Sequence, residues 1–141
     1  MESQGTRYGH ALKIERGEEI IATLGEFAAR AGVRAGALSG IGVAADLERG
    51  FFDPARREYV RRVFDQDHEI VGLMGNISEF EGRPYPHCHI VISGPDFIAY
   101  AGHLFRGRVT VTCEIQIVTD PGVLRRLPSP ELGINEMSLG R

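Results

Sequence analysis

The sequence predicts an α+β fold, in which one main helix packs on a mainly antiparallel sheet of seven or eight strands. Three observations lead to this class. Residues 18–31 repeat apolar side chains at helical spacing. Residues 108–118 alternate apolar and polar side chains with the period of a strand, and several other segments do the same more weakly. Helical and strand patterns do not alternate along the chain, which argues against parallel βαβ units.

The first part of the chain contains the only expected helix. A first strand is expected over residues 7–14, after a frayed polar start. The helix over residues 18–31 begins with Glu18 and Glu19, and acidic side chains suit the positive end of a helix dipole. Gly32 is placed to end the helix, because glycine readily adopts the left-handed conformation found there.

The rest of the chain predicts strands separated by turns. Glycines at residues 40–42 precede no helical pattern, so they indicate a tight bend of the sheet and not a phosphate loop. The hairpin that turns at residues 53–56 carries a basic patch, Arg56 to Arg62, which is typical of a solvated edge. Strands are expected over residues 33–39, 46–52, 58–64, 69–77, 87–92, 98–104 and 108–118.

Length and composition indicate a small globular protein. The chain has 141 residues, and we expect one domain over residues 1–123 followed by an extended tail, 124–141. This tail is expected to pack on the body or on a neighbouring subunit. Cys88 and Cys113 lie in apolar strand-like segments and are interpreted as buried thiols of a cytoplasmic protein. No apolar run is long enough to span a membrane.

Charge argues against strong binding to nucleic acid. The net charge is −3 and the isoelectric point is about 5.9. A protein that neutralises many phosphates needs a large basic surface, which this composition does not provide. We therefore expect weak or indirect association with DNA at most.

Three of the five histidines form a candidate metal site. His87 and His89 begin a strand, so their imidazoles project from one face with Cα atoms about 6.6 Å apart. A turn follows, and His103 lies on the expected return strand. His103 reaches the same face only if the numbers of paired residues sum to an even value, near 190 or 192. Three imidazoles with one open position suit zinc or a similar divalent ion. The alternative is that these histidines are only hydrogen-bonded.

The order of several motifs resembles the plants and prokaryotes conserved (PPC) domain, also called domain of unknown function 296. The match runs from residue 7 to about 120, and the matching segments are residues 17–20, 38–42, 73–78, 82–89 and 101–104. The resemblance implies a compact α+β domain that forms a homotrimer. It further implies that some members hold an ion on histidines that correspond to His87, His89 and His103.

Plant members of this family are fused to AT-hook peptides that bind the DNA minor groove. An AT-hook needs Arg-Gly-Arg-Pro within a basic, disordered peptide. Here Gly82-Arg83-Pro84 follows Glu81 inside the expected domain, so no AT-hook is expected. The stand-alone type of the family remains, with DNA association through a partner or a trimer surface.

Three classes of function stay open. The first is a trimeric, metal-carrying regulatory or interaction domain. The second is a metal-dependent enzyme of hydrolase or lyase type acting on a small molecule, with Asp96 or Glu79 as a candidate general base. The third is a cupin-like binder, which the early helix and the residues after His89 disfavour.

Overall fold

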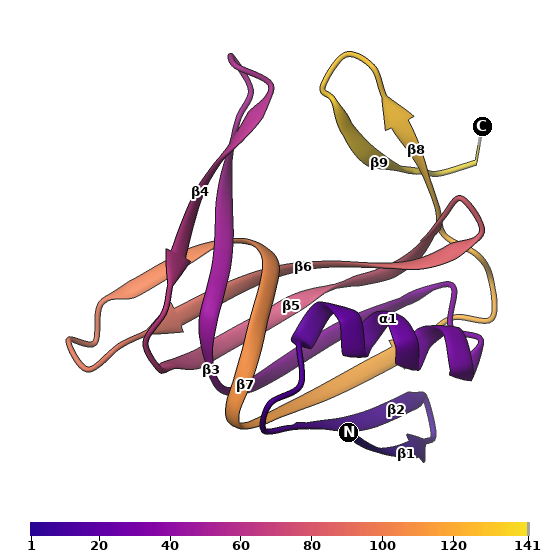
Figure 1. Cartoon of the computed structure of the whole chain (residues 1–141). Helices are drawn as coiled ribbons and strands as arrows, with labels where there is room; N and C mark the ends of the chain where they lie inside the picture. Colours follow the sequence, from indigo (N-terminus) through magenta and orange to yellow (C-terminus); the bar gives the residue numbers. More distant parts are fainter. Residues whose placement is uncertain (141) are drawn as a thin grey trace.

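The structure is a computed structural model that describes residues 1–140, and these residues form nine strands and one helix. Figure 1 shows a twisted sheet with the helix lying across one face. The elements are β1 (Glu2–Thr6), β2 (Gly9–Glu15), α1 (Ile20–Ala31), β3 (Gly36–Asp53), β4 (Glu58–Phe64), β5 (His68–Phe80), β6 (Arg83–Ser93), β7 (Ala99–Thr119), β8 (Arg125–Ser129) and β9 (Ile134–Ser138).

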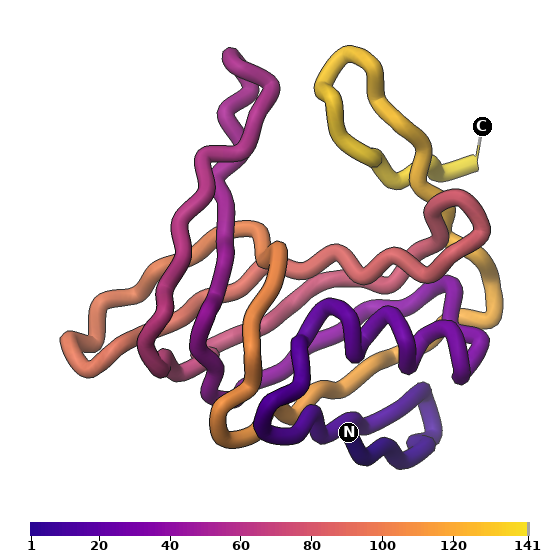
Figure 2. The backbone as a smooth tube through the Cα atoms, viewed as in Figure 1, coloured from indigo at the N-terminus to yellow at the C-terminus, as the bar shows by residue number. Residues whose placement is uncertain are grey.

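Two long strands, β3 and β7, organise the sheet. The strand order is β1-β2-β7-β3-β5-β8-β9, with β4 paired to β3 and β6 paired to both β5 and β7. The pairings of β3, β5, β6 and β7 therefore close into a ring. Figure 2 shows the β3–β4 hairpin and the β8–β9 hairpin rising from the same side of this sheet.

The predicted fold class is wrong in its strand content and in the type of sheet. The described part of the chain is mostly β, with nine strands in one mixed sheet and one helix of 12 residues. The sheet is mixed because β8 meets β5 through a parallel bridge, Glu79 with Arg125. The additional strands, β1, β8 and β9, come from polar segments that were expected to be frayed or extended. Strand pairing at a sheet edge is made by backbone groups, so it does not require apolar side chains.

The sheet bends where the glycines of residues 40–42 were expected to bend it. The register of β3 against β5 shifts between Gly40 and Gly42. A Cβ atom at Gly42 would lie 2.3 Å from the carbonyl oxygen of Thr112 on β7, so only glycine allows this close approach. The two strands expected on either side of this bend are consequently one continuous strand, β3.

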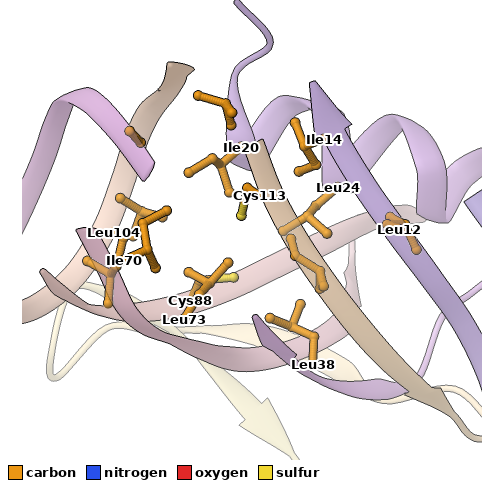
Figure 3. Packing of buried hydrophobic residues seen from close by; sticks show 14 of the residues in the cluster. Leu12, Ile14, Ile20, Leu24, Leu38, Ile70, Leu73, Cys88, Leu104 and Cys113 are labelled. Atoms are coloured by element: carbon orange, nitrogen blue, oxygen red, sulfur yellow. The ribbon is translucent and has the colours of Figure 1, made fainter. Parts of the chain in front are cut away.

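The helix and the sheet enclose the core. Glu19 caps α1 by accepting hydrogen bonds from the backbone N–H groups of Ile21 and Ala22, and Gly32 ends the helix with a φ of 68°. Burial of one large apolar side chain stabilises a fold by about 1.5–3 kcal/mol, so the buried apolar face of α1 holds the helix on the sheet. The side chains that α1 buries are Ile20, Leu24, Phe27 and Ala28. Figure 3 shows Ile20 and Leu24 packed near Cys113 of β7.

Among residues 1–140, no helix has the length and apolar character needed to cross a membrane.

Candidate metal centre

Three histidines from two paired strands meet on the sheet face opposite the core. His87 and His89 lie on β6, and His89 is paired directly with His103 on β7. The numbers of this pair sum to 192, the even register that places all three on one face. Each histidine offers a ligand nitrogen, and the three nitrogens lie within 4.8 Å of one another. The group could therefore hold one metal ion.

The β5–β6 pairing fixes where these histidines point. Gly75 of β5 lies opposite Cys88, and a Cβ atom there would lie 2.1 Å from the carbonyl oxygen of His87. Cys88 is fully buried on the core side, between two histidines that point the other way. Burial raises the pKa of the Cys88 thiol to about 12, so it remains protonated and is a poor metal ligand.

Two of the histidines are neutral at neutral pH. Burial, followed by the nearby charges of Arg126 and His89, lowers the pKa of His87 to about 4. Burial and the neighbouring His87 and His89 lower the pKa of His103 to about 4 as well. Neutral imidazole is the form that binds metal ions. The Nδ1 atom of His103 is buried and has no hydrogen-bond partner among the described residues. A metal ion bound by this nitrogen would give it a partner.

A buried arginine from β8 lies against the histidine group. The Arg126 side chain donates to the Nδ1 atom of His87 over 2.8 Å. Guanidinium has no acceptor, so this nitrogen must supply a lone pair and the proton of a neutral His87 ring resides on Nε2. A metal ion needs a lone pair from the same ring. His87 therefore cannot accept from Arg126 and bind an ion as a neutral imidazole at the same time.

A cavity of about 290 Å³ lies beside His87 and His103, and part of its lining comes from the β3–β4 and β8–β9 hairpins. Three aromatic rings pack together at its base in tilted and edge-to-face arrangements: the centroids of Tyr59 and His103 are 5.2 Å apart, and the Phe105 ring lies 4.6 Å from His103. Burial raises the pKa of Tyr59, which keeps its hydroxyl protonated. The lining residues are Tyr59, Arg61, Tyr85, His87, His103, Phe105, Arg126, Gly133, Ile134 and Asn135.

Comparison with known proteins identifies the family. Residues 1–120 match the Plants and Prokaryotes Conserved (PCC) domain. The chain belongs to this family. It is the family named in the sequence analysis, which the match confirms. No curated protein matched the chain.

Solved structures similar to this PCC protein share nearly its whole length. One is a "putative DNA binding protein" from Bacteroides thetaiotaomicron, with 28% identity and a TM-score of 0.93 over 97% of this chain and 96% of that one. Another, a "putative DNA-binding protein" from Ralstonia eutropha, has 25% identity and a TM-score of 0.90 over 98% and 96%. A metal-containing protein from Archaeoglobus fulgidus has 26% identity and a TM-score of 0.84 over 92% and 91%.

The PCC fold separates the histidines from both carboxylates considered as general bases. Asp96 lines a different pocket, where its side chain accepts from the backbone N–H of Ile98. Glu79 pairs with Arg34 and Arg125 outside the histidine cavity. No pattern in the sequence predicted Arg126 or the aromatic base of the cavity. No local signal marks Arg126, because three of its four partners lie 39 to 50 residues away on β5 and β6.

Proposed function

We propose that this PCC protein is a metal-binding regulatory or interaction protein, with His87, His89 and His103 holding one zinc or similar divalent ion. The observation that carries this proposal is the convergence of three imidazoles, with ligand atoms within 4.8 Å, on one sheet face. The metal-containing protein from Archaeoglobus fulgidus, with the same fold, adds support.

The donor set is suited to the role. Three imidazole ligands leave an open coordination position on a zinc-type ion, and such an ion can polarise an oxygen or lower the pKa of a bound water. The chain contributes the rest. β6 and β7 hold the imidazoles in register, and the rings of Tyr59 and Phe105 pack against His103.

A second candidate function is a metal-dependent enzyme acting on a small molecule. The cavity above the histidines favours it, since a substrate could reach the open position there. The described lining contains no carboxylate that could act as a general base. The protonated hydroxyl of Tyr59, which lines this cavity, is a candidate for proton donation.

Assembly and DNA association complete the proposal. We propose a homotrimer, because the sheet face not covered by α1 exposes apolar side chains that a neighbouring subunit would cover, among them Ile41, Met74 and Val118. DNA association, if direct, would use the basic hairpin of residues 56–62. We expect no AT-hook, and the position of residues 82–84 at the turn and start of β6 supports that expectation. The division into a domain of residues 1–123 and a tail of 124–141 stays a prediction.

Metal analysis tests the proposal. The protein should be prepared without a metal-affinity tag, dialysed against zinc and then against buffer, and measured by elemental mass spectrometry. We expect about one ion per chain in the wild type and little in His103→Ala. His68→Ala removes a histidine outside the group and should leave the metal content unchanged. Cys88→Ser tests the face assignment and should also keep the ion. Full zinc in His103→Ala would contradict the proposed site.

A further inference from the structure

Arg126 is a buried cation without a negatively charged partner. It is 6% exposed, and its guanidinium donates to neutral groups: the Ser78 hydroxyl, the Asn76 side-chain oxygen, the Asn135 carbonyl and His87. None of the ion pairs formed within residues 1–140 includes it. Burial of an unpaired charge is unfavourable, so the position calls for an anion.

The cavity beside Arg126 has an excess of positive charge. Its described lining includes two guanidinium groups and no carboxylate. The other guanidinium, Arg61, is already paired with Glu48 at 3.0 Å. Arg126 therefore carries the unneutralised charge. Its four acceptors use four of its five N–H groups, which leaves one Nη1 N–H to donate to an oxygen of a carboxylate or phosphate.

The aromatic walls of the cavity indicate which chemical group would accompany the oxyanion in a ligand. The Tyr59 and Phe105 rings meet at 5.0 Å in an edge-to-face arrangement, and the Tyr85 ring lies 5.2 Å from the guanidinium carbon of Arg126. Aromatic surfaces of this kind favour a flat or apolar group. A volume of about 290 Å³ restricts the ligand to a small molecule.

We propose that this cavity binds a small molecule bearing a carboxylate or phosphate, with the oxyanion on Arg126 and the body against Tyr59 and Phe105. The inference deepens the proposed function and rests on it in one respect, since His87 belongs to both sites. If His87 binds an ion, it stops accepting from Arg126, and the released N–H becomes available to the oxyanion. Zinc should therefore strengthen anion binding, while Arg126 supports weaker binding without it.

Isothermal titration with three probes tests the inference at constant ionic strength. Benzoate and phenyl phosphate carry the two oxyanions on a flat ring, and benzyl alcohol is the neutral control. We expect benzoate or phenyl phosphate to bind at least tenfold more tightly than benzyl alcohol, in both chelated and zinc-loaded protein. Arg126→Gln should weaken that binding at least tenfold. Arg125→Gln is the matched control, because the neighbouring Arg125 is exposed, pairs with Glu79 and should leave affinity unchanged.

A second measurement uses the wild type alone, so it tests the inference even if Arg126→Gln does not fold. In the wild type, benzoate should shift the NMR signals of the Arg126 Nε–H group and of the amides of Gly133 and Asn135, which line the cavity. Equal affinity for benzyl alcohol, or no binding of either anion at millimolar concentration, would overturn the inference. Zinc binding without anion binding would refute only this inference. Anion binding that needs Arg126 in a protein that takes up no zinc would refute only the metal site.

Discussion

Replacing Gly75 with alanine should damage both the stability of the protein and its histidine site. The added Cβ would lie 2.1 Å from the carbonyl oxygen of His87 and 2.9 Å from Cys88 Cα, whereas real Cβ atoms essentially never come within 3.0 Å of such atoms. β5 and β6 must therefore separate by nearly an ångström. Overpacking costs about 1–3 kcal/mol. Loss of one ladder hydrogen bond adds about 1 kcal/mol, so we expect a free energy of unfolding lower by about 2–4 kcal/mol.

This displacement should also reduce metal affinity. The clash falls on the backbone of His87 itself, and metal–ligand distances tolerate deviations of only about 0.2 Å. Domains of this kind are stable by about 5–15 kcal/mol, so Gly75→Ala should still fold and its metal content can be measured. We expect substoichiometric zinc after the same dialysis that leaves the wild type loaded.

Urea denaturation of chelated protein, at one fixed protein concentration, measures the change in the free energy of unfolding. Gly72→Ala on the same strand is the control, because the nearest atom to its added Cβ is the flexible Met74 side chain at 3.8 Å. It should change the free energy of unfolding by less than about 1 kcal/mol and keep the ion. If Gly75→Ala were as stable as Gly72→Ala, the β5–β6 register that positions His87 would be wrong.

Three further predictions concern pH, assembly and DNA. The pKa of His87 and of His103 is about 4 in the folded protein and about 6.5 when unfolded, so the unfolded chain binds more protons between these values. Chelated protein should therefore lose stability as pH falls from about 6.5 to about 4, and His87→Gln/His103→Gln should flatten that slope in urea titrations. Light scattering should give three times the chain mass of 15.5 kDa, and a monomer at micromolar concentration would refute the trimer. Duplex DNA should bind weakly and without sequence preference at physiological salt; nanomolar, selective binding would show that residues 56–62 contribute more than expected.

The elements that the sequence predicted well are those with a strong local pattern. The helix begins at Ile20 and ends at Ala31, against an expected 18–31, and β4 has the expected bounds. The strands β1, β8 and β9 were missed because their side chains are mostly polar and their order comes from pairing with a neighbouring strand. Edge pairing depends on the backbone of a partner distant in sequence, which periodicity does not reveal.

In the candidate site, too, the sequence predicted only the residues that follow from a local strand pattern. Strand alternation places His87 and His89 on one face, and the short hairpin leaves few registers for His103. The sequence gives no comparable route to Arg126 or Tyr59. Tyr59 lies on a hairpin that precedes the histidines in the chain and Arg126 on one that follows them, so their proximity is a property of the tertiary fold alone.

The pairing of β2 with β7 also affects how the chain folds during its synthesis. Leu12 of β2 lies opposite Ile115, so the neighbour that β2 needs is made roughly a hundred residues later. At about 5–20 residues per second, a ribosome takes on the order of 5–20 seconds to cover that distance. During this interval β2 and the apolar face of α1 are without the strand that buries them. The nascent segment of β2 and α1 is therefore a natural substrate for chaperones, and the sheet closes only after β7 has been made.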